Sequence, residues 1–199
     1  RSHYAHIGVA NALAAEHPTI TKAMAEQFFR AHRVREEAEG VTVISAESLY
    51  RHFLTEAGVP TRAPKPADYW PCRFRFIEYL RSLTGPAEIA IVLRRQCDFA
   101  ESMYQEHVKV TRYRDSFEKF TRDYWYHFVY SEQIEAWQRY FDKVHIIKLS
   151  DIAGDDIARK FLRRLSLKPG RLHPTEMANV GLGKDAVIFK RLLNGTNLP

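Results

Sequence analysis

The chain has 199 residues, 45% hydrophobic and 27% charged, a composition typical of a globular domain that buries one core. Its 30 Lys and Arg against 24 Asp and Glu give a net charge of +6, which favours a polyanionic ligand or partner. No apolar run approaches the roughly 18 residues of a membrane-spanning helix. Two cysteines provide neither a disulfide framework nor a metal site. We therefore expect no integral membrane segment, no metal and a cytoplasmic location.

The first 40 residues predict two helices. Residues 1–17 form an amphipathic pattern that Pro18 ends, and Thr19 or Thr21 can cap a second helix that runs to about Glu39. The side chains expected to face inward on the second helix are Met24, Phe28, Phe29 and Val34.

A strand-to-helix unit and a proline-rich segment follow. Residues 41–44 are apolar and predict a short buried strand, after which Ser45 can cap a helix that continues to Leu54. Four prolines between residues 58 and 71 predict an extended loop. Residues 72–83 then return to helical spacing.

The most informative stretch runs from residue 87 to residue 109. Every residue from Ile89 to Leu93 is apolar, which predicts a strand covered on both faces, and a helical repeat begins near Cys97 or Asp98. Arg94 and Arg95 stand between the two elements. Because a helix N-terminus offers free N–H groups and a positive dipole, two adjoining guanidinium groups predict an anion-binding site.

An aromatic segment lies between residues 111 and 130, and its rings could form core or stack against a sugar. We expect core, because part of the segment has helical spacing. The rest of the chain predicts a helix over 131–142, a strand over 144–149, a helix from Asp151, an irregular loop and a last helix over 184–194. Three strands that alternate with helices predict an α/β fold with a parallel sheet.

Arg94, Asp98 and Ser102 together resemble the sulfotransferase pattern in which a strand-end Arg and a helical Ser hold the 3′-phosphate of the donor. The sequence Leu-Arg-Arg-Gln at 93–96 is closest to bacterial sulfotransferase-like proteins, and the resemblance covers roughly residues 38–195. It implies a three-layer, P-loop-like fold whose central parallel sheet is flanked by helices. It also implies transfer of a sulfuryl group from 3′-phosphoadenosine 5′-phosphosulfate (PAPS) to a hydroxyl acceptor such as a glycan or glycolipid, with 3′,5′-ADP as product.

The resemblance assigns roles to individual residues. Arg94 and Ser102 would bind the donor, and a C-terminal loop containing Asn179, Gly181 and Gly183 would close over it. Arg94 could instead pair with Asp98 or Glu101 at the surface while Ser102 faces solvent.

Glu47, expected just past the strand over 41–44, is the first candidate for the base that takes the acceptor proton. A Glu at a helix start is also favourable without any catalytic role. His3 and His6 are alternative bases.

Sulfotransferases begin with a strand and a loop that bind the 5′-phosphosulfate, and residues 1–40 contain no such pattern. We therefore expect residues 1–199 to be a single sulfotransferase-like domain that lacks its first strand-loop-helix unit, with a groove beside the strand at 87–93. Two alternatives stay open: an adenine-nucleotide-binding protein of this fold without catalysis, and a basic nucleic-acid-binding domain. The second is disfavoured because the basic residues are scattered and no nucleic-acid-binding motif is present.

Overall fold

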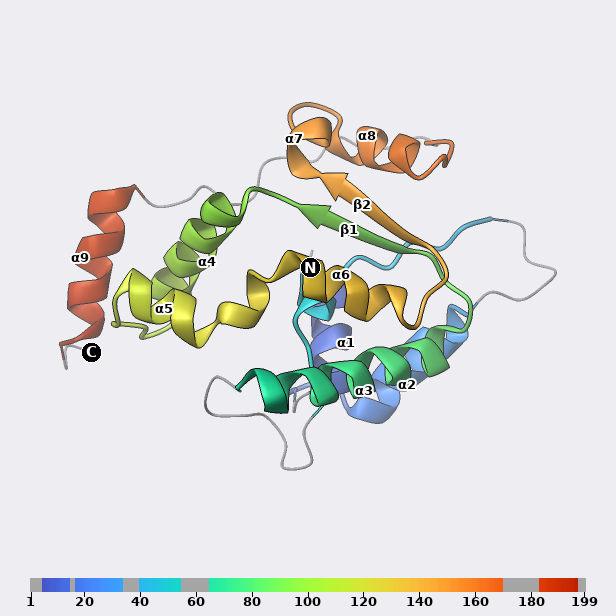
Figure 1. Ribbon diagram of the computed structural model, residues 1–199, viewed down its shortest axis with the longest axis horizontal. Coiled ribbons are helices and arrows are strands. Elements are labelled where there is room, and N and C mark those ends of the chain that lie inside the picture. Colours follow the sequence, from blue (N-terminus) through green and yellow to red (C-terminus); the bar gives the residue numbers. More distant parts are fainter. Residues whose placement is uncertain (1–4, 15–16, 34–39, 55–64, 170–182, 197–199) are drawn as a thin grey trace. The chain divides into compact units, whose positions relative to one another are not determined.

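The computed structural model describes residues 5–14, 17–33, 40–54, 65–169 and 183–196. The chain divides into two compact units, which are treated separately below. Unit 1 comprises residues 1–91 and 129–145, and unit 2 comprises residues 92–128 and 146–199. Helices and a two-stranded parallel sheet are both present, in keeping with the predicted α/β class (Figure 1).

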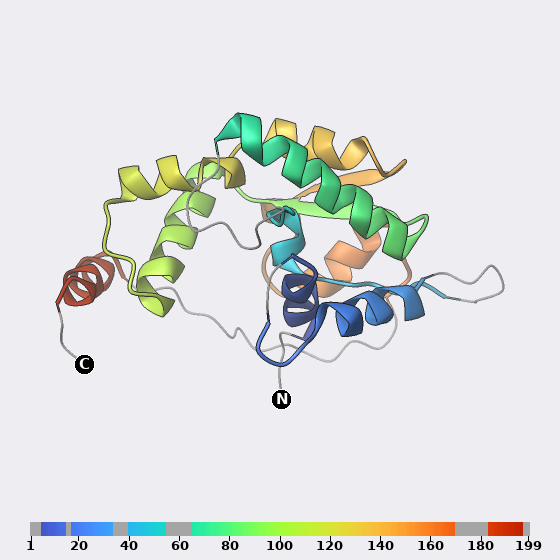
Figure 2. The ribbon, with the colours of Figure 1, turned by 90° about the horizontal axis from the view of Figure 1, so that it is seen from below.

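Unit 1 is built mainly from helices that pack around α3. Its helical elements are α1 (Ala5–Ala14), α2 (Lys22–Ala31), the short 3-10 helix η1 (Glu47–Tyr50), α3 (Pro66–Thr84) and α6 (Tyr130–Gln138). Helix α3 lies alongside α2 and α6, and α1 contacts both α2 and η1 (Figures 1 and 2). The buried apolar residues of α3 lie on one face of the helix and form the centre of this core: Tyr69, Phe76, Ile77, Leu80 and Leu83.

Helix α3 begins earlier than the proline content suggested. The predicted extended loop over 58–71 is wrong from Pro66 onward, where the chain is helical. Pro66 occupies the first turn, where its missing N–H would have no helical partner in any case, and Pro71 lies inside the helix. The helix ends at Gly85, whose φ of 70° is a conformation that favours glycine. A side chain there would also meet Arg33, since a Cβ would lie 2.6 Å from its Nε.

Two other predictions in this unit are corrected. Residues 41–46 are not in a strand, and Val41 and Val43 are exposed, because no neighbouring strand pairs with this described stretch. Ser45 caps no helix: η1 begins at Glu47 and ends at Tyr50. Thr21 does cap α2, its side chain accepting from the N–H of Met24, but the Met24 side chain is 53% exposed rather than inward.

The sheet joins β1 (Ile89–Leu93) and β2 (Val144–Lys148), and the boundary between the units falls within each strand. Both strands lie close to their predicted positions. The N–H of Ile89 donates to the carbonyl oxygen of Lys143 at 2.9 Å. At the same end of the sheet, the carboxylate of Glu88 accepts from Lys143 Nζ at 2.8 Å and pairs with His145 Nε2 at 2.7 Å.

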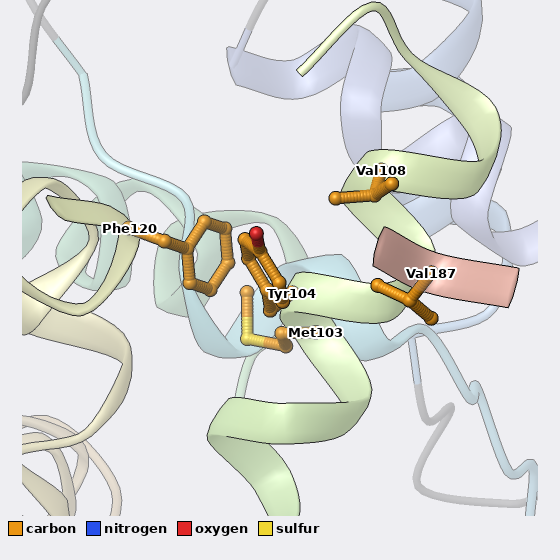
Figure 3. Packing of buried hydrophobic residues seen from close by; sticks show 5 residues of the cluster. All are labelled: Met103, Tyr104, Val108, Phe120 and Val187. Atoms are coloured by element: carbon orange, nitrogen blue, oxygen red, sulfur yellow. The ribbon is translucent and has the colours of Figure 1, made fainter. Parts of the chain in front are cut away.

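Unit 2 contains α4 (Gln96–Val110), α5 (Phe117–Asp123), η2 (Trp125–His127), α7 (Leu149–Ile152), α8 (Ile157–Arg164) and α9 (Lys184–Asn194). Its core joins α4, α5 and α9, and Figure 3 shows the five residues that form it: Met103, Tyr104, Val108, Phe120 and Val187. Phe120 is fully buried and its ring contacts those of Tyr104, His107 and Tyr124. The centre of the aromatic segment is therefore core, as expected.

The helix predicted from Asp151 is instead two short helices, α7 and α8. Asp156 separates them with a left-handed backbone, φ 64°, which interrupts helical hydrogen bonding. No residue of α8 is buried, and Ile157 is 40% exposed.

Candidate anion-binding site

The candidate site lies at the junction between β1 and α4. Leu93 ends the strand, Arg94 and Arg95 follow, and Gln96 is the first residue of the helix. The apolar run forms the strand as predicted because β-branched and aliphatic side chains favour that conformation. Helix α4 begins within two residues of its predicted start.

Both arginines of this junction are exposed. Arg95 is the N-cap residue of α4, and its side chain makes no capping hydrogen bond. The first backbone N–H groups of α4 therefore receive no cap from that residue, and two arginines directly precede them in the chain. This combination favours an anion at the N-terminal end of α4.

Helix α4 separates its polar face from its core face. Ala100, Met103, Tyr104 and Val108 are buried, whereas Asp98 and Ser102 are exposed. Ser102 follows Asp98 by four positions, so both lie on the same side of the helix. The thiol of Cys97 donates to Asp98 Oδ1 at 3.4 Å. The exposed face thus offers a neutral hydroxyl one turn after a carboxylate, and the carboxylate would oppose an anion placed close to it.

Helix α9 lies beside α4 and runs in the same direction. Val187 packs in the core with Met103 and Tyr104, while Asn194 contacts the C-terminal end of α4, donating to the carbonyl oxygen of Val108 at 3.0 Å. The N-terminal end of α9 therefore lies toward the N-terminal half of α4, which includes Ser102 (Figure 1).

Gly183 is the exposed N-cap residue of α9, with φ −63° and ψ 156°. No atom lies within 4 Å of the position where a Cβ would be, so neither space nor backbone conformation requires glycine there. Asn179 and Gly181 lie outside the described residues. Of the predicted C-terminal loop, the structure therefore places only Gly183, in the same unit as Arg94 and Ser102.

Glu47 belongs to unit 1, where it is the exposed first residue of η1. Two residues before Glu47, the N–H of Ser45 donates to His6 Nδ1, on one of the alternative bases, at 3.3 Å. With Nδ1 accepting this bond, the proton of a neutral imidazole is on Nε2, so neither ring nitrogen is free to accept another. This favours Glu47 over His6 as a base. His3 lies outside the described residues.

A buried polar network holds the segment that contains Glu47. Arg73, fully buried on α3, donates from Nη1 to the carbonyl oxygens of Leu49 at 3.0 Å and His52 at 2.6 Å. Its Nε donates to Gln133 Oε1 at 3.1 Å, and Gln133 Nε2 donates to the hydroxyl of Tyr69 at 2.6 Å. Helices α3 and α6 and the η1 segment are thereby linked through a single guanidinium.

Arg73 has no carboxylate partner among the residues that the structure describes, and its Nη2 makes no hydrogen bond there. Desolvation lowers the pKa of Arg73 to about 10. Desolvation, and next the charge of Arg51, lowers the pKa of the partly buried His52 to about 3, while burial raises the pKa of Tyr50. Carbonyl and amide oxygens, rather than an acid, compensate this buried cation.

Sequence reasoning missed this network, although a signal was present. Arg73 lies four residues after Tyr69 and three before Phe76, so it occupies the apolar face of α3. An arginine on an apolar helix face is buried only when several oxygens can receive its five N–H groups.

Comparison of the chain with protein-family models, with curated proteins and with solved structures gave no match. Within the described ranges, no three His, Cys, Asp or Glu side chains are grouped as ligands of one metal ion would be. None of the described helices is long and apolar enough to cross a lipid bilayer.

Proposed function

We propose that this protein transfers a sulfuryl group from PAPS to a hydroxyl acceptor, a glycan or glycolipid, on a three-layer, P-loop-like sulfotransferase fold. The observation that carries the proposal is the junction of β1 and α4, where exposed Arg94 and Arg95 adjoin an N-terminus without a side-chain cap from its N-cap residue. In this proposal Arg94 and Ser102 bind the 3′-phosphate of the donor. A planar guanidinium and a neutral hydroxyl suit a phosphate monoester, which needs several donors and positive charge.

In the proposed reaction the acceptor oxygen bonds to sulfur as the bond between sulfur and the bridging phosphate oxygen breaks, and 3′,5′-ADP leaves. Glu47 accepts the proton of the acceptor hydroxyl. An exposed carboxylate at the start of η1, on a segment fixed by Arg73, supports this role because its backbone is held in place. Gly183, with Asn179 and Gly181, remains a predicted part of the donor site.

The proposal is tested by comparing the thermal stabilisation of the protein by 3′,5′-ADP, 5′-AMP, ATP and a DNA oligonucleotide. We expect 3′,5′-ADP to stabilise more than 5′-AMP and Arg94→Ala to abolish the difference. A hydrogen bond to a charged group contributes about 1.5 to 3 kcal/mol, so the loss in affinity should be about tenfold or more. Arg122→Ala is the matched control: it removes the same charge from unit 2 at an exposed ion pair with Glu118.

Equal stabilisation by 3′,5′-ADP and 5′-AMP would refute the 3′-phosphate site. Selective binding of 3′,5′-ADP without sulfuryl transfer to any acceptor would favour a nucleotide-binding protein of this fold. Stabilisation by the oligonucleotide alone would favour the nucleic-acid-binding alternative.

A further inference from the structure

Helix α9 carries an apolar face that is exposed to solvent. The exposed fractions are 50% for Ile188, 64% for Phe189, 62% for Leu192 and 37% for Leu193. These residues are spaced by one, three and four positions, so they form one continuous stripe along the helix. Single exposed apolar residues are ordinary, but a stripe of four large ones on one helix marks an interaction surface.

The stripe lies opposite the side by which α9 binds α4. Val187 is buried in the core, Arg191 Nη1 donates to the hydroxyl of Tyr104 at 3.4 Å, and Asn194 donates to backbone carbonyls at the end of α4. No other described element of unit 2 lies on the far side of α9 (Figure 1). The exposed stripe is therefore separate from the contacts that hold the helix.

Basic residues border the stripe on both sides. Counted at about 100° per residue, Arg191 falls on one edge, toward Tyr104, and Lys190 on the other. Asp185, the single acidic residue of α9, lies on the same face one turn before Ile188 and Phe189, so the apolar stripe begins at Ile188. A lysine in the position of Lys190 can extend its charged end away from an apolar surface while its methylene chain covers it.

The charge of the whole chain is concentrated in the same unit. Unit 2 has 17 Lys and Arg against 11 Asp and Glu, whereas unit 1 has 13 of each. The entire net charge of +6 is therefore carried by unit 2.

We propose that unit 2 binds the surface of a membrane containing anionic lipid, with Ile188, Phe189, Leu192 and Leu193 inserted at the interface. An apolar stripe bordered by basic residues is the pattern of helices that lie in the plane of such a surface. Lysine is depleted from protein–protein interfaces, so a partner protein is a poorer match to this stripe than a membrane surface. A second copy of the protein is disfavoured as the partner, because two copies whose unit 2 carries a net charge of +6 repel each other. This inference does not depend on sulfuryl transfer.

The test measures co-sedimentation of the full chain with vesicles, without nucleotide or acceptor. One vesicle type is pure phosphatidylcholine and the other contains about one third phosphatidylserine, enough for a negative surface potential. We expect binding to the anionic vesicles and at least about tenfold weaker binding for the double variant Phe189→Ser/Leu192→Ser, which loses two inserted side chains. Met24→Ser, an exposed apolar residue of unit 1, is the matched control and should bind like the unchanged protein.

A second variant tests how much the basic residues of α9 contribute to membrane binding. Lys190→Glu should weaken binding to anionic vesicles by at least about fivefold, since each basic residue near such a surface contributes about 1 kcal/mol. Lys65→Glu makes the same charge change at an exposed position of unit 1 and should have little effect. Because Lys190→Glu deletes no apolar side chain, it tests the proposal even if the double variant fails to fold.

Three results would overturn the proposal. They are absence of binding to the anionic vesicles, equal binding to both vesicle types, and unchanged binding by both α9 variants. A dimer in analytical ultracentrifugation that Phe189→Ser/Leu192→Ser converts to a monomer, without vesicle binding, would assign the stripe to a second copy instead.

Discussion

Arg73 Nε donates to Gln133 Oε1 at 3.1 Å, and both side chains are fully buried. Gln133 also donates to the hydroxyl of Tyr69. One buried amide therefore accepts from Arg73 and donates to Tyr69, where water cannot reach either group. The contact joins α3 to α6 through polar atoms inside an otherwise apolar core. Its importance to unit 1 can be measured directly.

Gln133→Leu should destabilise the protein by roughly 2 to 4 kcal/mol, because Arg73 Nε and the Tyr69 hydroxyl would each lose a partner while remaining buried. Urea unfolding followed by tryptophan fluorescence measures the change. Gln138→Leu makes the same replacement at an exposed position of α6 and should change the free energy of unfolding by less than about 0.5 kcal/mol. Similar effects of the two variants would mean that the buried network contributes little.

Asn194 anchors the end of α9. Its side-chain amide donates to the carbonyl oxygens of Tyr113 at 2.8 Å, Val108 at 3.0 Å and Thr111 at 3.2 Å. Asn194→Ala should weaken the attachment of α9 by about 1 to 2 kcal/mol, seen as faster hydrogen exchange in α9 and in residues 108–113.

Asn194→Asp should weaken the attachment of α9 more than Asn194→Ala does. A carboxylate cannot donate a hydrogen bond, and its negative charge is unfavourable at the C-terminal end of α4. Gln138→Ala, which removes an exposed side-chain amide from α6 in unit 1, is the control. Equal exchange rates in Asn194→Ala and Asn194→Asp would contradict this account of the contact.

Stability should depend on pH through His52. Its pKa is lowered from 6.5 to about 3 in the folded state, first by desolvation and then by Arg51 and Arg73. Because the unfolded chain binds this proton more readily, the contribution is fully present above pH 6.5 and is lost as pH falls toward 3. The expected slope is up to about 1.4 kcal/mol per pH unit.

His52→Gln keeps a donor for Asn11 Oδ1, which lies 2.9 Å from His52 Nε2, but cannot be protonated. The difference in unfolding free energy between pH 6.5 and pH 4 should therefore be smaller in this variant. His32→Gln, at an exposed position, is the matched control. An unchanged pH dependence in His52→Gln would show that other groups cause the acid destabilisation.

Glu47→Gln should lower sulfuryl-transfer turnover at least about a hundredfold without changing the affinity for 3′,5′-ADP. The amide is nearly isosteric with the carboxylate but cannot accept the acceptor proton. Glu78→Gln, an exposed change on α3, should leave turnover unaltered. Near-normal turnover in Glu47→Gln would leave Glu47 with a role only in the start of η1.

The sequence alone was sufficient to predict the bounds of those helices and strands that local apolar periodicity specifies. The strand at 89–93, the helix that follows it and the helix at 184–194 were predicted within a residue or two, because apolar periodicity reflects which side of an element faces the core. Arg94 and Ser102 could be singled out because both are close to one chain junction.

Tertiary structure decided the features that depend on distant residues. Val41 and Val43 have strand-forming side chains, yet a strand requires a partner and this stretch has none among the described residues. Arg73 is buried because oxygens from residues 49, 52 and 133 meet around it, a convergence that no local pattern encodes. The apolar stripe of α9 is likewise visible only once Val187 and Asn194 show which side of that helix α4 covers.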